Sequence, residues 1–290
     1  MRIAVLGATG TVGRALVPLL AQEHDVLAVS RRRREESAGV RWARADATNG
    51  AAVARVLDGV EVAYYLVHSL GSPAFEQRDR AAAETVAREA ERAGVRQLVY
   101  LGGLGDDSQE LSRHLRSRAE TAAALASGSV PVTILRAAIV IGAGSAAFET
   151  IVALVDRLPG MVCPRWVSTR TQPIALDDIA AYLAAVAGCD AAIGESFDAG
   201  GPDVMTYREM IERVARLRGK RPLIVEVPLL SPRLSSYWLN LVTPVRASVA
   251  RPLIEGLRNT TVARDDRLSR LVPRALSPFD EAARAALAAR

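Results

Sequence analysis

Short runs of apolar residues alternate with amphipathic stretches along the first half of the chain. The apolar runs are IAVL (3–6), VLAV (26–29), VEVAYYLV (60–67), VRQLVYL (95–101) and VPVTILRAAIVI (130–141). Helical patterns lie between them, for example near 12–22 and 110–126. Apolar strands that alternate with helices of ten or more residues are typical of a parallel sheet covered on both faces. The pattern therefore predicts an α/β fold with a doubly wound parallel sheet.

The rhythm changes after about residue 145, where prolines become frequent and the elements become shorter. Thr206 and Glu209 form a TxxE pattern that predicts a capping box at the start of a helix, and Gly219 is expected to end that helix. We expect a first domain over residues 1–160, to which 172–190 adds, and a smaller substrate-binding lobe over 191–290 that packs on it.

Charge and composition indicate an ordinary globular protein. Of the 290 residues 50% are hydrophobic, and the formal net charge is +5, spread along the chain beside many acids. Aromatic residues make up only 4%, too few for a base-stacking surface, so we expect no nucleic-acid partner. Lys220 is the only lysine, which indicates that arginine usage here reflects a coding bias.

Cys163 and Cys189 stand far apart and outside any Cys/His cluster, so neither a disulfide framework nor a metal site is expected. The first residues already have the pattern of a strand, and no uncharged apolar run reaches the ~18 residues of a membrane span. We therefore expect a cytoplasmic protein, a monomer or homodimer, for which peripheral membrane contact stays open.

The segment GATGTVG, residues 7–13, follows the first apolar run and leads directly into a helical pattern. Gly7 permits a sharp turn, Gly10 lets the backbone approach a phosphate, and Gly13 lets the helix pack tightly on the strand. The helix N-terminus offers free N–H groups and a positive dipole. At this place in the first βαβ unit, the segment predicts a Rossmann-type fold that binds the pyrophosphate of a dinucleotide.

The second apolar strand ends at Ser30, which Arg31 follows. An NAD-binding site usually places Asp or Glu here, whereas a serine hydroxyl and an arginine can hold a 2′-phosphate. This favours NADP(H) over NAD(H), although an exposed arginine-rich loop would also explain the arginines. Asp46, after the third strand, is placed to reach the adenine, to cap the next helix, or to do both.

Several motifs together resemble the atypical, extended-type short-chain dehydrogenase/reductases, and most closely their NmrA-like, NAD(P)H-binding branch. They are the N-terminal GxxGxxG, ARADATN, YLVHSL and LVYLGGLG, followed by SRAETAAAL, ILRAAIVIGAGSAAFE, TQPIALDDIAAYL and FDAGGPDVMTYREM. The resemblance extends through residue 210 and covers at least two thirds of the chain. It implies the Rossmann-type fold and binding of a nicotinamide dinucleotide.

The resemblance also shows what this chain lacks. Active family members use Ser or Thr at the end of the fifth strand and a Tyr-x-x-x-Lys pair on the next helix, whose lysine lowers the pKa of the tyrosine and holds the nicotinamide ribose. Here Gly102 and Gly103 end the strand, and the pair occurs as HLRSR. Alignment on SRAE puts His114 at the tyrosine position and Arg118 at the lysine position, on one helix face. These two are the candidate catalytic residues; a pocket wall is the alternative for His114.

The loop after the fourth strand is expected, by resemblance, to line the cofactor, and the glycines of the fifth strand to leave room near the nicotinamide. Because Tyr64 and Tyr65 point to opposite faces, we expect one of them in the core. The expected cofactor-binding residues are Gly7, Thr9, Gly10, Thr11, Val12, Gly13, Ser30, Arg31, Asp46, Ala47, Leu66, Val67, His68, Gly102 and Arg118. The expected substrate-pocket residues are Ser69, Gly103, Ile139, Gln172 and Trp238.

Residues 228–259 are apolar and punctuated by prolines, with no acid before Glu255. Leu234, Tyr237, Trp238 and Leu241 recur at helical spacing. The stripe indicates a helix that packs over the substrate site. A surface for a hydrophobic substrate, a partner or a membrane interface is the alternative.

These observations leave three functions open. The first is an NADP(H)-dependent oxidoreductase that transfers a hydride to a small apolar acceptor, a quinone or a carbonyl compound, without the Ser-Tyr-Lys triad. The second is a non-catalytic protein that senses NADP(H) and regulates a partner. The third is a nucleotide-sugar epimerase, which the missing tyrosine disfavours.

Overall fold

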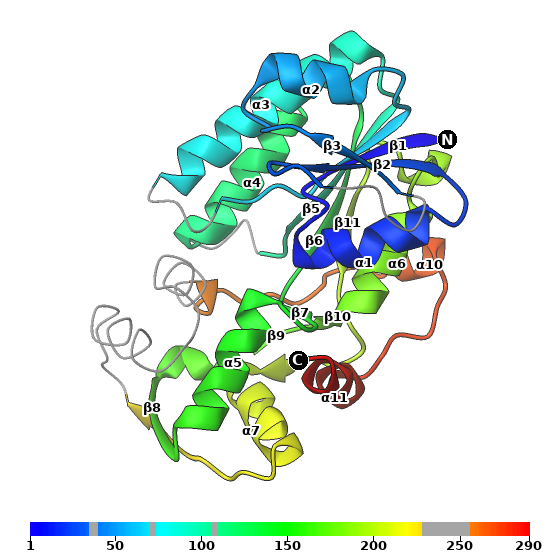
Figure 1. Ribbon diagram of the computed structural model, residues 1–290. Helices are drawn as coiled ribbons and strands as arrows, with labels where there is room; N and C mark the ends of the chain where they lie inside the picture. Colours follow the sequence, from blue (N-terminus) through cyan, green and yellow to red (C-terminus); the bar gives the residue numbers. More distant parts are fainter. Residues whose placement is uncertain (35–39, 70–73, 106–109, 228–255) are drawn as a thin grey trace.

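The computed structural model describes residues 1–34, 40–69, 74–105, 110–227 and 256–290. Its centre is a seven-stranded sheet with the order β11-β6-β5-β4-β1-β2-β3, in which every pairing is parallel. Helices α2, α3 and α4 cover one face, and α1 and α6 cover the other (Figure 1). The predicted doubly wound Rossmann-type sheet is confirmed.

The bounds of the elements follow the predicted alternation closely in the first half of the chain. The strands of the central sheet are β1 (Arg2–Leu6), β2 (Asp25–Ser30), β3 (Arg41–Arg44), β4 (Val62–Tyr65), β5 (Gln97–Gly103), β6 (Val132–Ala137) and β11 (Ser196–Ala199). The helices around them are α1 (Thr11–Leu20), α2 (Gly50–Leu57), α3 (Phe75–Ala93), α4 (Arg113–Leu125), α6 (Leu176–Ala185) and α10 (Arg267–Leu271).

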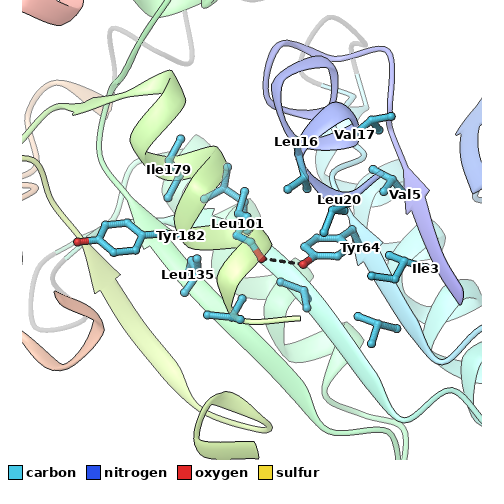
Figure 2. Close-up of a cluster of buried hydrophobic side chains, with 14 of the residues drawn as sticks. Ile3, Val5, Leu16, Val17, Leu20, Tyr64, Leu101, Leu135, Ile179 and Tyr182 are labelled. Carbon is cyan, nitrogen blue, oxygen red and sulfur yellow. Dashed lines mark hydrogen bonds between the residues drawn. The ribbon is translucent and has the colours of Figure 1, made fainter. Parts of the chain in front are cut away.

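Both tyrosines at the end of β4 lie in the core, although only one was expected there. Tyr64 packs beneath α1 and α6 and donates a hydrogen bond to the Leu183 carbonyl at 2.7 Å (Figure 2). Tyr65 packs on the opposite face, beneath α2 and α3. Alternating side chains of a strand are both buried when helices cover both faces of the sheet, so the alternation does not separate core from surface here.

A second lobe forms its own hydrophobic cluster below the carboxyl edge of the sheet (Figure 1). Its helices are α5 (Ala146–Arg157), α7 (Tyr207–Leu217) and α11 (Phe279–Ala288). Its short strands are β7 (Val140–Ile141), β8 (Gly160–Pro164), β9 (Arg170–Thr171), β10 (Ile174–Ala175), β12 (Met205–Thr206) and β13 (Leu223–Val227), which pair two by two. Short helical turns span Arg165–Ser168 and Asp190–Ala192.

The chain crosses between the two lobes more often than the expected division suggests. Helix α5 lies before residue 160 but packs in the second lobe, whereas β11 lies after residue 191 but forms the edge of the central sheet. The apolar residues of α5 face those of α7, and β11 pairs with β6 along its length. Each segment packs where its apolar residues are buried, so the two lobes cannot be separated at a single position in the sequence.

The capping signals of the sequence appear in the structure. The Thr206 hydroxyl accepts from the Glu209 backbone N–H, and the Glu209 carboxylate accepts from the Thr206 backbone N–H. This reciprocal pair is the predicted capping box of α7. Among the described residues, no helix is both long and apolar enough to cross a membrane.

Candidate functional site

The glycine loop between β1 and α1 is held by close backbone contacts. Gly7 adopts φ +90°, and a Cβ there would come within 2.6 Å of the Leu66 carbonyl oxygen. A Cβ on Gly13 would come within 2.6 Å of the Gly7 oxygen, so α1 packs on the loop at a distance that only glycine permits. These are the roles in turning and packing that the sequence indicates for Gly7 and Gly13.

Gly10 has a different environment. It is the N-cap of α1, with no side-chain hydrogen bond over the first turn, and the nearest atom to a Cβ built on it is the Gly7 oxygen at 3.3 Å. Two side-chain hydrogen bonds stabilise the loop. Thr11 Oγ1 donates to the Gly144 carbonyl at 2.7 Å, and the Arg14 side chain of α1 donates to the Thr9 carbonyl at 2.9 Å. An open approach to uncapped helix N–H groups fits a dinucleotide pyrophosphate.

The residues expected to hold the 2′-phosphate lie at the end of β2. Ser30 is buried, and its hydroxyl donates to the Arg32 carbonyl. This bond directs the Ser30 proton into the turn, so the hydroxyl presents its oxygen rather than a free donor. Arg31 is exposed, and its positive charge acts on Asp46 across the gap between the two loops.

Asp46 follows β3 and does not cap the next helix, which corrects one of its two expected roles. Asn49 caps α2, with its side chain accepting from the Ala52 N–H at 3.0 Å. Asp46 accepts from the Thr48 N–H and hydroxyl at 3.0 and 2.8 Å and from Arg78 at 3.2 Å. The backbone hydrogen bond from Thr48 is the main cause that lowers the pKa of Asp46, so this carboxylate is charged at neutral pH.

Four other expected cofactor residues pack their side chains against the core, Ala47 fully and the other three in part. Val12 and Leu66 pack on the face of the sheet that α1 and α6 cover, and Ala47 and Val67 pack on the face that α2, α3 and α4 cover. At Leu66 the carbonyl is the atom that lies against Gly7. This loop after β4 was expected to line the cofactor, and the apolar side chains of Leu66 and Val67 anchor its backbone to the core.

The next two residues of this loop, His68 and Ser69, contact a buried acid of α3, Asp79. Asp79 is 1% exposed, and its two carboxylate oxygens contact His68 Nδ1 and the Ser69 backbone N–H, each at 2.9 Å. Burial is the main cause that lowers the pKa of His68, and the hydrogen bond to Asp79 acts in the opposite direction. The backbone N–H of Ser69, expected in the substrate pocket, is thus used to hold this loop.

Asp79 lies beside the expected site residues but is not among the residues that the sequence predicts there. It lies on the apolar face of α3 with Phe75, Ala82, Ala83 and Val86, all of them buried. An acid at a position where the helical period calls for an apolar residue was the signal that could have found it, since a buried carboxylate requires partners.

His114 and Arg118 share one face of α4, as predicted. The rings of His114 and His68 lie with centroids 5.4 Å apart, and His114 Nδ1 is buried with no hydrogen-bond partner within residues 1–34, 40–69, 74–105, 110–227 and 256–290. Burial, with the nearby positive charges, lowers the pKa of His114 to about 3, so this imidazole is neutral at physiological pH. Arg118 donates to the Leu101 carbonyl, and its guanidinium lies 4.8 Å from the centre of the Tyr100 ring.

The room expected beside the glycines of β5 is filled at Gly103. A Cβ built on Gly103 would come within 2.9 Å of Leu115 Cδ2 and within 3.5 Å of Arg118 Cγ. The missing side chain therefore lets α4 pack on the end of the sheet, and the space that a Cβ would occupy is taken by Leu115. At Gly102 a Cβ would make ordinary contacts with Tyr100 and Ile134.

The other expected substrate residues have structural roles. The Gln172 side chain donates to the Gly201 carbonyl at 2.7 Å and accepts from the Ala263 N–H at 2.9 Å, which ties three loops together. Ile139 is 9% exposed and belongs to the core of the second lobe. Trp238 and most of the apolar segment 228–259 lie outside the described residues.

The fold and the loop define a nicotinamide-dinucleotide-binding protein of the Rossmann type. The model of a family described as NAD(P)H-binding matches residues 7–166, more than half of the chain. The chain belongs to this NAD(P)H-binding family, as its motifs indicated.

The chain is also similar to one known protein in sequence and to two solved structures in fold. It is 26% identical over 239 residues to subunit 9 of the NADH dehydrogenase [ubiquinone] 1 alpha subcomplex from mitochondria of Arabidopsis thaliana; the match covers 77% of this chain but only 60% of that subunit. The structure of an Escherichia coli NADPH-dependent quinone oxidoreductase with NADPH matches with TM-score 0.76, 21% identity and coverage of 97% and 98% of the two chains. A nucleoside-diphosphate-sugar epimerase from Staphylococcus aureus matches with TM-score 0.78, 15% identity and coverage of 98% and 100%. At these identities the two structures bear on the fold alone.

Proposed function

We propose that this protein is an NADP(H)-dependent oxidoreductase that transfers a hydride to a small apolar acceptor, a quinone or another carbonyl compound. The observation that carries the proposal is the adjacency of two features at the carboxyl edge of one sheet. An open phosphate cradle at Gly10 follows β1, and His68 follows the neighbouring strand β4, where its ring meets His114 of α4. Arg118 lies on the same helix and its charge acts on both imidazoles. Ligands of open parallel sheets bind at this edge.

The preference for NADP(H) rests on the end of β2. Ser30 occupies the position where an acid would repel a 2′-phosphate, and the exposed guanidinium of Arg31 can pair with that phosphate. The quinone oxidoreductase of similar fold was solved with NADPH, which agrees with this preference.

The chain can support such a reaction without the family's tyrosine. When bound, the reduced nicotinamide supplies the hydride, and the protein has to orient the acceptor and handle one proton. Arg118 holds a positive charge at the end of β5 through the Leu101 carbonyl, and further N–H groups of the guanidinium can bind a ribose hydroxyl. Such a charge also favours oxyanion character on an acceptor carbonyl.

Oxidation of NADPH, followed by its absorbance against a panel of quinones, aldehydes and ketones, tests the proposal, with NADPH and NADH binding measured by calorimetry in parallel. Turnover with an acceptor of one class, and tighter binding of NADPH than NADH, are expected. Failure to bind either dinucleotide, or binding without turnover on any acceptor, would refute the oxidoreductase assignment.

A non-catalytic NADP(H) sensor is the second candidate, and one observation favours it. The residue at the position of the family's tyrosine is His114, whose pKa of about 3 leaves its imidazole neutral at neutral pH, so it carries no imidazolium proton to donate. A sensor needs the cradle but no proton donor. It predicts tight NADPH binding without consumption, and a protein partner whose capture depends on NADPH.

A further inference from the structure

A buried carboxylate faces the candidate site from α3, a helix that carries none of the residues the family uses for catalysis. Asp79 is 1% exposed, and a charge at that depth is stable only when hydrogen bonds replace its hydration. Its oxygens divide between two neighbours in sequence, His68 Nδ1 and the Ser69 N–H, at 2.9 Å each. Two bonds to one short loop fix both the position and the rotation of the His68 ring.

The carboxylate also determines which nitrogen of His68 carries the proton. Because Asp79 Oδ2 can only accept, the neutral imidazole places its proton on Nδ1, and Nε2 keeps its lone pair. Loss of a proton from Nε2, or gain of one there, therefore changes the ring between neutral and cationic forms while Nδ1 stays bonded. Such an arrangement is suited to general acid–base chemistry at Nε2.

The position of the pair relates it to the cofactor site. His68 is two residues beyond Leu66, whose carbonyl lies against Gly7 of the phosphate-binding loop. On its other side the His68 ring meets the His114 ring of α4, and the Arg118 charge acts on both imidazoles. His68 thus lies between the glycine loop and the helix on which the family places its proton donor.

The two histidines differ in their capacity to hold a proton. His114 Nδ1 is buried and has no hydrogen-bond partner among the described residues, so no acceptor there stabilises a proton on this nitrogen. His68 has a carboxylate at hydrogen-bond distance, and its side chain is 27% exposed, which gives it access to protons from solvent. Among the described residues, the charged and titratable groups that face His68 are Asp79 from α3 and His114 and Arg118 from α4.

We propose that His68 is the proton-transferring catalytic residue of this site and that Asp79 is its positioning residue, in place of the absent tyrosine. The proposal rests on the oxidoreductase function above. In the reductive direction the acceptor C=O gains a hydride from the reduced dinucleotide and a proton from His68 Nε2, so its π bond is replaced by the new bond to hydrogen and the O–H bond. His68 is left neutral and regains its proton from solvent. In the oxidative direction Nε2 accepts the hydroxyl proton.

The histidine content makes a direct test possible, since the chain has three histidines. Long-range ¹H–¹⁵N spectra of the ¹⁵N-labelled full chain give the tautomer of each imidazole, and the His68 signals are those lost in His68→Gln. Neutral His68 is expected in the Nδ1–H form. In Asp79→Asn the remaining amide oxygen can accept from Ser69, the amide NH₂ then faces Nδ1, and the ring is expected in the Nε2–H form. His68 in the Nε2–H form in the unaltered protein would overturn the assignment regardless of activity.

Activity gives the second readout. His68→Gln and Asp79→Asn are each expected to lower kcat for NADPH oxidation at least 100-fold while the Kd for NADPH stays within threefold. Glu84→Gln is the matched control: it removes a carboxylate from the same helix, but Glu84 is 47% exposed and pairs with Arg80. It is expected to retain full activity and the Nδ1–H tautomer of His68.

The pH profile separates proton transfer from a structural role. Burial lowers the pKa of His68, so kcat/KM for acceptor reduction is expected to rise as the pH falls below about 6.5, and His68→Gln is expected to lose this dependence. If the unaltered protein oxidises NADPH and His68→Gln does so equally fast, the His68 assignment is wrong and the proposed function stands. If the unaltered protein binds NADPH but reduces nothing, both are wrong.

Discussion

The imidazole rings of His68 and His114 face each other with centroids 5.4 Å apart, yet their Nδ1 atoms have opposite environments. His68 Nδ1 contacts the Asp79 carboxylate at 2.9 Å, whereas His114 Nδ1 is buried and finds no hydrogen-bond partner in the part of the chain that the structure describes. The residue that aligns with the family's tyrosine, on helix α4, therefore lacks an acceptor for a proton at Nδ1, and the residue that has this acceptor lies in the loop after β4.

This difference predicts how stability depends on pH. The pKa of His114 is about 3 in the folded protein and close to 6.5 once unfolded, so the unfolded chain binds the proton first as the pH falls. The contribution of His114 is fully present above pH 6.5 and is lost progressively down to about pH 3. When the pH is lowered from 7 to 5, the unfolding free energy of the unaltered protein should fall by up to about 2 kcal/mol more than that of His114→Gln. Urea unfolding at both pH values measures this, and equal losses would contradict the burial of His114.

The glycine loop gives a prediction that separates binding from folding. Gly10→Ala adds a methyl group where a phosphate would lie, and the nearest atom of the fold is the Gly7 oxygen at 3.3 Å, which has to move only slightly. NADPH affinity should therefore fall at least about tenfold, while the unfolding free energy should fall by about 1 kcal/mol. Gly13→Ala places its methyl group 2.6 Å from the Gly7 oxygen and should cost about 2 kcal/mol or more.

Gly94→Ala is the control for these substitutions. Gly94 ends α3 with φ +69° and has no atom within 4 Å of a built Cβ, so alanine there should cost about 1 kcal/mol and leave NADPH binding unchanged. Calorimetric titration and urea unfolding give the two readouts. Unchanged NADPH affinity in a folded Gly10→Ala variant would mean that the pyrophosphate does not bind at this loop.

Local patterns of the sequence were sufficient for strands β1 to β6 of the central sheet, the glycine loop and the capping box at Thr206. Each of these depends on a period or a spacing within about 15 residues, which a single sequence displays directly. They also led to the NAD(P)H-binding family, because the turn, the close approach and the tight packing are all encoded in one heptapeptide.

Contacts between distant segments were not accessible in the same way. The pairing of Asp79 with His68 joins a helix face to a loop, and the filling of the Gly103 space depends on how closely α4 approaches β5. The strand β11 was assigned to the wrong lobe because its pairing with β6 bridges about 60 residues of sequence. Local propensity carries no information about such distances, although the acid on the apolar face of α3 was a visible sign that a partner must exist.

The cofactor preference has its own test at the end of β2. Ser30→Asp with Arg31→Ala introduces an acid that can bond a ribose 2′-hydroxyl and removes the cation that can pair with a 2′-phosphate. The ratio of the Kd values for NADPH and NADH should shift at least about tenfold toward NADH. Arg34→Ala, which removes an exposed arginine three residues further on, should leave the ratio unchanged. A ratio that the double substitution does not alter would show that the 2′-phosphate binds elsewhere.

The hydrogen bonds of Gln172 predict that this residue stabilises the fold and does not contact the substrate. Its amide links the Gly201 carbonyl and the Ala263 N–H, so Gln172→Met, which keeps the length of the side chain but removes both hydrogen bonds, should lower the unfolding free energy by about 2 kcal/mol. Gln22→Met, at an exposed glutamine, should change it by less than about 0.5 kcal/mol. Because both polar atoms of Gln172 are already engaged with backbone groups, the KM for the acceptor should stay within twofold. A tenfold rise in KM at unchanged stability would instead place this amide against the substrate.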